Sequence, residues 1–187
     1  MMQTIANRPV RRIVTADGPD GRSLALSDGP VEDVLRDPAR TGFESARVWA
    51  TDRSPAIGLT AEEVAGLPGF IEPPPGGALF RIVTVPPDHV WRSDVSPEAA
   101  RAFFVAAGSA HIWCGPGARH LYMQQSRSLD LCVVLEGELT LVLDTADVVL
   151  RAGDTVVQRG TRHAWSNRSS LPAVLAISSH DAESPPA

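Results

Sequence analysis

Residues 120–132 are the stretch of this sequence in which side chains able to do chemistry are most regularly spaced. Polar and apolar residues alternate there, a pattern typical of a β-strand with one polar face. The polar face holds a carboxylate and several groups that could orient a ligand: His120, Tyr122, Gln124, Ser126, Ser128, Asp130 and Cys132. The opposite face holds Leu121, Met123, Leu129 and Leu131. This alternation predicts a polar pocket between apolar walls.

A second candidate group follows later in the chain, where His163 and Trp165 lie two residues apart and therefore on one face of a strand. Imidazole changes its charge near neutral pH, so a histidine beside a carboxylate can take up and release protons. Trp165 offers a planar surface for an aromatic or polyene ligand. Both residues also have a purely structural interpretation. His163 can be a core residue bonded to Tyr122 or to backbone, and Trp165 can be simple packing.

Short strands separated by tight turns must position these side chains. Leu139, Leu141 and Leu143 alternate with other residues in one strand, and apolar runs over 133–135, 148–150 and 155–157 predict its neighbours. Gly137 and Gly153 stand at chain reversals, where glycine supplies backbone conformations that other residues avoid. We therefore expect an antiparallel meander over residues 120–168.

Two blocks within this stretch resemble the two sequence motifs of the cupin family of small β-barrels. The first cupin motif has two histidines one residue apart, then an acid and a glycine. The corresponding residues here are Gln124, Ser126, Asp130 and Gly137. The second motif has a glycine, a turn, a histidine and an asparagine, matched here by Gly153, residues 159–161, His163 and Asn167. The resemblance implies an all-β cupin double-stranded β-helix (jelly roll) barrel with an N-terminal β-arm and one or two short helices.

The resemblance also implies a metal site, from which this sequence departs. Cupins bind divalent transition metals through three histidines and one acid, because imidazole and carboxylate suit such ions. Gln124 and Ser126 replace the first two histidines, which leaves His163, Asp130 and the weak ligand Gln124 as candidate metal ligands. A catalytic ion usually needs three protein ligands. The cofactor therefore stays open between a divalent metal (Fe, Mn, Ni or Zn) and none.

Similar single-domain cupins are tailoring enzymes of polyketide-type pathways, and this implies the leading hypothesis for function. His163 and Asp130 would act as an acid–base pair on a small carbonyl-containing metabolite, by dehydration, isomerisation, cyclisation or decarboxylation. The substrate would be bound by Gln124, Ser126, Tyr122 and Trp165. Two alternatives remain: a metal-free cupin that binds a small molecule without transforming it, and a metal-dependent oxygenase. The missing histidines favour the first alternative.

Composition excludes several other classes of protein. With 187 residues, 43% of them hydrophobic, the chain can form one stable core. A net charge of −5 argues against nucleic-acid and anionic-membrane partners. All 17 basic residues are arginine, which excludes lysine Schiff-base chemistry.

The start of the chain lacks the apolar core of a signal peptide, and no apolar run is long enough to span a membrane, so we expect a cytoplasmic protein.

We divide the chain into an arm and connecting segment packed on the barrel (1–72), the barrel (73–178) and a disordered polar tail (179–187). Strands are predicted over 11–15, 23–27, 44–51 and 78–85, and helices from the capping box at Thr60 and from Ser96–Pro97. Residues 28–30 should end the second strand and residues 31–42 should form a loop. The arm either lies on its own barrel or is exchanged with a second subunit, and we expect a homodimer.

Overall fold

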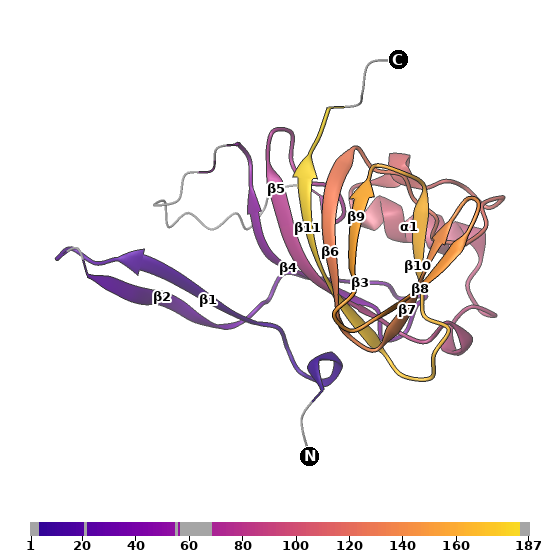
Figure 1. Ribbon diagram of the computed structural model, residues 1–187, viewed down its shortest axis with the longest axis horizontal. Coiled ribbons are helices and arrows are strands. Elements are labelled where there is room, and N and C mark those ends of the chain that lie inside the picture. The colour runs from indigo at the N-terminus through magenta and orange to yellow at the C-terminus, as the bar shows by residue number, and fades with distance from the viewer. Residues whose placement is uncertain (1–3, 21, 55, 57–68, 184–187) are drawn as a thin grey trace.

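The computed structural model of this protein describes residues 4–20, 22–54, 56 and 69–183. The strands are β1 (Arg11–Asp17), β2 (Ser23–Pro30), β3 (Val34–Arg36), β4 (Glu44–Thr51), β5 (Ala78–Val85), β6 (Ser128–Glu136), β7 (Glu138–Leu143), β8 (Asp147–Arg151), β9 (Thr155–Arg159), β10 (His163–Ser166) and β11 (Ala173–Asp181) (Figure 1). The helices are α1 (Pro97–Ala106) and the short 3₁₀ helices η1 (Ile5–Asn7), η2 (Asp88–Val90) and η3 (Ala110–Ile112). The predicted all-β fold is confirmed.

Two sheets enclose the interior of the barrel. The larger has the strand order β3-β4-β5-β11-β6-β9, and the smaller has the order β10-β7-β8. Along β6 the buried residues are Ser128, Asp130, Cys132 and Val134, while the residues between them are exposed. The strand thus turns Ser128, Asp130 and Cys132 inward and its leucines and Val133 outward, because the period of a strand is two.

The predicted meander is confirmed for β7 and β8, which pair as chain neighbours, and wrong for its other pairings. β6 pairs with β9 and β11, whereas β7 pairs with β8 and β10. The chain crosses between the sheets at Gly137, whose φ is +80° and where a side chain would lie 3.0 Å from Ala173 and from the Pro172 carbonyl. This position therefore requires glycine for two reasons, conformation and space. The crossing wraps both sheets around one interior, which hairpin pairing of neighbours would not do.

The predicted strand also begins too early. Residues 120–127 are irregular, and only Gln124 forms isolated bridges, with Trp113 and with His163. Strand alternation with a period of two therefore begins at Ser128. In residues 120–127 the direction of each side chain depends on the local bends of the chain and not on alternation.

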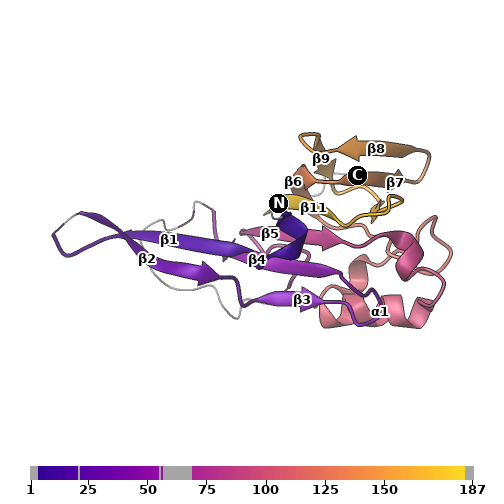
Figure 2. The same ribbon diagram turned by 90° about the horizontal axis from the view of Figure 1, so that it is seen from below.

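The N-terminal strands form as predicted over 11–15, 23–27 and 44–51, but they divide into two groups. β1 and β2 make a separate hairpin that projects from the body (Figures 1 and 2), whereas β4 joins the main sheet beside β5. β2 continues through residues 28–30, and β3 lies within the predicted loop, so both of these details were wrong. The helix predicted from Thr60 lies outside the described residues.

The tail predicted from Ser179 was wrong for its first residues. β11 runs to Asp181 between β5 and β6, and Ser179 is fully buried. Polar composition suggested disorder, but pairing on both edges satisfies the backbone of this segment and keeps it in the sheet.

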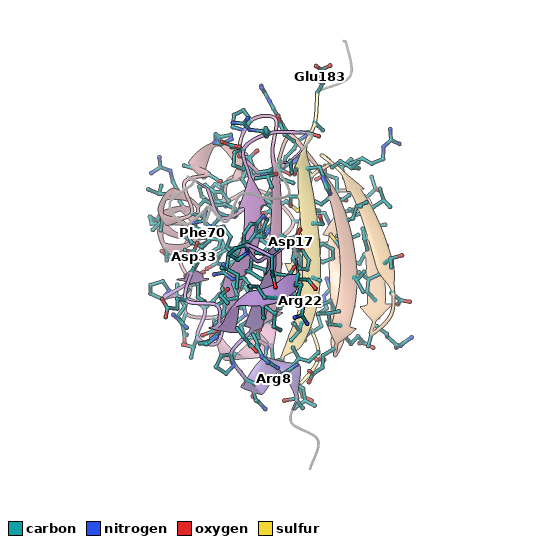
Figure 3. The ribbon with its side chains drawn as sticks, turned by 90° about the vertical axis from the view of Figure 1, so that its left-hand side faces the viewer. Arg8, Asp17, Arg22, Asp33, Phe70 and Glu183 are labelled. Atoms are coloured by element: carbon teal, nitrogen blue, oxygen red, sulfur yellow. The ribbon has the colours of Figure 1, made fainter. Side chains whose placement is uncertain are left out.

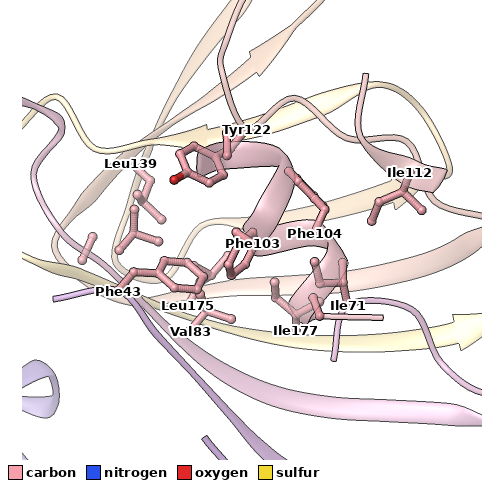
Figure 4. Packing of buried hydrophobic residues seen from close by; sticks show 14 of the residues in the cluster. Phe43, Ile71, Val83, Phe103, Phe104, Ile112, Tyr122, Leu139, Leu175 and Ile177 are labelled. Carbon is pink, nitrogen blue, oxygen red and sulfur yellow. The ribbon is translucent and has the colours of Figure 1, made fainter. Parts of the chain in front are cut away.

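The helix α1 closes one side of the barrel and begins as predicted, with Ser96 Oγ accepting the amide of Ala99 at 3.2 Å. Figure 4 shows Phe103 and Phe104 of this helix against Leu175 and Ile177 of β11.

In the part of the chain that the structure describes, no helix has the length and apolar character needed to cross a bilayer.

The side chain of Asn167 stabilises the turn between β10 and β11. Its amide donates to the carbonyls of Val85 at 2.9 Å and Leu171 at 2.8 Å, and its Oδ1 accepts from the backbone and hydroxyl of Ser169. Asn167→Ala would leave these carbonyls and the Ser169 donors without their hydrogen-bond partner. We therefore expect the free energy of unfolding to fall by about 3 kcal/mol in urea denaturation. The neighbouring exposed change Ser170→Ala should cost under about 0.5 kcal/mol. Equal effects would contradict this role for Asn167.

Candidate functional site

A cavity of about 50 Å³ lies inside the barrel, between the main sheet and α1. Its polar wall consists of Arg40, Ser45, Arg81, Tyr122 and Gln124. The rest is apolar and comes from β3, β5, β10, β11, α1 and loops: Leu35, Phe43, Ile71, Val83, Val85, Phe103, Phe104, Trp165 and Ile177. An apolar pocket with a few convergent polar groups is the usual form of a small-molecule site.

The two arginines of this wall are held differently. Arg40 is ion-paired with Asp37 at 3.0 Å, and its guanidinium lies between the rings of Phe43 and Tyr122, 3.8 and 3.6 Å from their centroids. Arg81 donates only to the carbonyl of Phe70, at 3.2 Å, and forms no ion pair with any described residue. Burial lowers the pKa of Arg81, and the charge of Asp130 partly offsets this. Arginine keeps its proton in proteins, so an unpaired buried charge remains.

The barrel interior contains several buried polar atoms that meet no hydrogen-bond partner among the described residues. They are Ser45 Oγ, Arg81 Nε, Tyr122 OH, Asp130 Oδ1 and Ser179 Oγ, together with Trp91 Nε1 and His120 Nε2. Burial raises the pKa of Tyr122, so its hydroxyl stays protonated and can donate. Buried polar groups are nearly always paired, and each exception needs an explanation. Several exceptions on strands facing one interior indicate a site for a polar ligand.

His163 is held in one tautomer. Its Nδ1–H donates to the Thr161 carbonyl at 2.9 Å, so its Nε2 accepts from the Gln124 amide at 3.2 Å. A pair of backbone hydrogen bonds between His163 and Gln124, both 2.9 Å, fixes this arrangement. Burial lowers the pKa of His163 and keeps the ring neutral, although the Thr161 carbonyl and Asp130 partly oppose the shift.

Asp130 is the only carboxylate on the inward face of β6, and it is 3% exposed. It forms no hydrogen bond with His163, because both nitrogens of that ring are already occupied. It is coupled electrostatically to Arg81, a charge of opposite sign. Next to it on this face, Cys132 is inert, since burial raises the pKa of its thiol to about 12.

The structure brings together some of the predicted site residues and separates others. Tyr122, Gln124 and Trp165 line the cavity. Asp130 and His163 are buried but do not line it. Ser126 lies instead in a groove at the mouth of the barrel, with Arg159 and Arg162, and its hydroxyl is bonded to that of Ser128 at 2.8 Å. The predicted role of Ser126 beside Gln124 is therefore not what the geometry favours.

The donor set does not fit a tightly held transition metal. Nowhere in the described ranges do three or more His, Cys, Asp or Glu side chains come together as a metal site. The remaining candidates, Asp130 and His163, supply too few ligands, and Nε2 of His163 faces the Gln124 amide. The acid–base chemistry that this site can perform therefore uses its side chains alone.

The sequence analysis missed Arg40, Ser45 and Arg81 as site residues. One signal could have found Arg81, since it is the only charged residue on the inward face of β5, between Leu79 and Val83. A charge on a face that is otherwise apolar is rarely buried unless it has a function. Arg40 and Ser45 gave no such signal, because β3, β4 and the turn between them place these residues.

His120 provides a prediction for stability. It accepts the amide of Tyr122 on Nδ1 at 3.2 Å, and burial lowers its pKa to about 4, with further lowering by Arg92. The unfolded chain therefore binds this proton more readily than the folded chain between about pH 6.5 and 4. As the pH falls through that window, we expect His120 to remove on the order of 3 kcal/mol of stability.

Urea denaturation at several pH values checks this expectation. The variant His120→Gln should show a flatter dependence of unfolding free energy on pH, whereas His89→Gln, at an exposed position, should keep the wild-type curve. Identical slopes for all three proteins would refute the assignment.

Comparisons with known proteins agree with the architecture. The family model described as "Cupin domain" matches residues 115–179. Phomopsin biosynthesis cluster protein C′ of Diaporthe leptostromiformis is 32% identical over 157 residues, which cover 80% of this chain and 67% of the relative. Protein D of the same cluster matches equally. A cupin-domain-containing oxidoreductase of Hypocrea virens is 44% identical over 46 residues, 24% of either chain.

Among solved structures, a cupin 2 conserved barrel domain protein from Salinispora arenicola covers 85% of this chain and 92% of its own. Its TM-score is 0.43 and its identity 18%.

Proposed function

This chain belongs to the cupin family, and from that premise we propose that it is a tailoring enzyme of secondary metabolism. It would act on a small carbonyl-containing metabolite by acid–base chemistry, with Asp130 as the base. The printed names of the Diaporthe relatives place those proteins in a biosynthetic cluster, which supports the same setting here.

The observation that carries the proposal is the group of unpartnered polar atoms inside the barrel. Asp130 Oδ1 has no hydrogen bond to any residue that the structure describes, whereas His163 uses both ring nitrogens. A carboxylate with a free lone pair can accept a proton from a carbon beside a carbonyl, breaking the C–H bond and forming an O–H bond. Returning that proton to another carbon isomerises the substrate, and returning it to a departing hydroxyl releases water.

The neighbouring residues have supporting roles in this scheme. Tyr122 can donate its hydroxyl to the oxygen on which negative charge develops. His163 holds the Gln124 amide at the cavity wall through the 3.2 Å contact. Because Asp130 does not line the cavity, the proton reaches it after a wall side chain turns aside or through one bridging water.

Solvent exchange tests this function without knowledge of the natural product. The protein would be incubated in D₂O with a panel of 2-oxo and 3-oxo acids, ketones and β-hydroxy ketones, and proton NMR would follow deuterium entry beside the carbonyl. We expect catalysed exchange or elimination with at least one member of the panel. Binding without exchange would support the alternative, a cupin that holds its ligand unchanged, which the replacements at Gln124 and Ser126 favour.

We also propose that the working form is a homodimer. The outer face of the main sheet carries large exposed apolar side chains: Phe80, Leu129, Leu131, Val133, Leu135 and Val157. Strand register places Phe80, Ser178, Leu131 and Val157 in one row across β5, β11, β6 and β9. Contiguous exposed apolar surface of this kind marks an interaction site.

The position of the β1–β2 hairpin supports a second copy as the partner. Figure 3 looks onto the main sheet from the side on which the hairpin projects. At its base, Arg12 contacts Trp49 and the Val48 carbonyl, so the hairpin leaves the body beside the apolar face. Two copies related by a two-fold axis would bury the same face on each subunit, and each hairpin would reach over the other subunit.

A further inference from the structure

Three polar groups of the cavity wall share an unusual state. Arg81, Tyr122 and Ser45 are each at most 5% exposed, and Arg81 Nε, Tyr122 OH and Ser45 Oγ form no hydrogen bond of normal length with the residues described, although the Tyr122 hydroxyl interacts with Asp37 and Arg40 electrostatically. All three residues line the same cavity. Their chemistry is also alike, since a guanidinium and two hydroxyls can each donate a hydrogen bond to one acceptor.

The positive charge on the cavity wall favours a negatively charged hydrogen-bond acceptor. Arg40 is neutralised by Asp37 and its guanidinium is covered by aromatic rings, so it needs no ligand. Within the described residues, Arg81 has neither an ion pair nor an aromatic cover, and its only hydrogen bond goes to the Phe70 carbonyl. A buried cation without a hydrogen-bonded counter-ion is costly, and an anion that accepts from it recovers that cost.

We propose that this cavity binds the carboxylate of a small organic acid, with Arg81 as its cation and Tyr122 and Ser45 as hydroxyl donors. The inference rests on the proposed function and specifies its substrate class: the carbonyl metabolite also carries a carboxylate, as 2-oxo and 3-oxo acids do. Planar guanidinium groups match the two oxygens of a carboxylate better than they match a single carbonyl oxygen.

The rest of the cavity limits what is attached to that carboxylate. Phe43, Phe103, Val83 and Ile177 surround the polar groups with hydrocarbon. A cavity of about 50 Å³ holds about four water-sized groups. The carboxylate and a short apolar or oxo-bearing segment therefore occupy it, rather than a sugar or a nucleotide.

Equilibrium binding of propanoate and propanamide, two probes of one shape and different charge, tests the site. Titration followed by NMR of the labelled protein should show propanoate binding at least about 10-fold more tightly than propanamide. Arg81→Met should remove that preference. Equal affinities, no propanoate binding at tens of millimolar, or a preference that survives Arg81→Met would each overturn the proposal.

Because Arg81 is also coupled to Asp130, two milder variants keep the test valid if Arg81→Met fails to fold. Ser45→Ala removes a hydroxyl that bonds to no described residue, so its melting temperature should hold while propanoate binds about 3- to 10-fold more weakly. Tyr122→Phe should weaken binding by a similar factor, and it also removes the interaction of the hydroxyl with Asp37 and Arg40. Ser179→Ala is the matched control, since its hydroxyl is equally buried and unpartnered but does not line the cavity. Equal weakening by Ser179→Ala would count against the site.

The binding measurement and the exchange experiment can each refute one proposal without refuting the other. Arg81-dependent propanoate binding without any solvent exchange leaves an anion-binding cupin and removes the enzyme. Exchange into neutral ketones without carboxylate preference leaves the enzyme and removes the anion site.

Discussion

Asp130→Asn is expected to slow solvent-deuterium exchange into a responsive substrate by at least about 100-fold, the usual range for loss of a general base. The amide has nearly the shape of the carboxylate but cannot accept a proton at neutral pH. Substrate affinity should change far less than turnover, because Arg81, Tyr122 and Ser45 supply the binding contacts in our proposal. The measurement is the exchange rate by NMR at saturating substrate.

A matched variant separates this effect from a general change in charge. Asp144→Asn makes the same substitution in an exposed turn, where Asp144 pairs with Arg162 at 3.6 Å, and it should leave the exchange rate unchanged. Asp130→Asn also removes the negative charge coupled to the buried Arg81, so the melting temperature of the variant is measured beside its exchange rate. An Asp130→Asn protein that melts normally and retains more than about a tenth of the rate would assign the base elsewhere.

Leu131→Glu is expected to convert the dimer into a monomer, weakening self-association by at least about 100-fold, which corresponds to roughly 2.7 kcal/mol. Leu131 lies in the row of the outer sheet face between Ser178 and Val157, and it is 47% exposed in the single chain. A two-fold interface would bury this position in both subunits, so one substitution places two carboxylates in apolar surroundings. Sedimentation velocity over a range of protein concentrations measures the change.

Val149→Glu provides the control on the other sheet. Val149 lies on β8, is 53% exposed and, like Leu131, faces outward from a strand. The substitution should therefore cost similar strand propensity while leaving the dimer intact. If wild-type protein sediments as a monomer, or if both variants dissociate equally, the outer face of the main sheet is not the interface.

The local signals in the sequence predicted the secondary structure well wherever one strand or cap determines it. β5 occupies Ala78–Val85 as its alternation predicted, and α1 begins after Ser96 because serine and proline there favour a helix start. The second cupin-like motif also contains Asn167, whose side chain donates hydrogen bonds to carbonyls of its own turn and of β5.

The sequence by itself determined that the chain is a cupin barrel, that the polar side of β6 faces inward, and that Asp130 and His163 lie in the interior of the barrel. These properties follow from residue types at a fixed period and from two motifs, and both are local in the chain. Only the tertiary structure decided which groups meet. It bonded His163 to Thr161 and Gln124 and left Asp130 Oδ1 without a hydrogen bond to the residues described. It also brought Ser45 and Arg81 to Tyr122 from β4 and β5, because contacts between distant strands depend on the register and the crossing of two sheets, which no short-range pattern encodes.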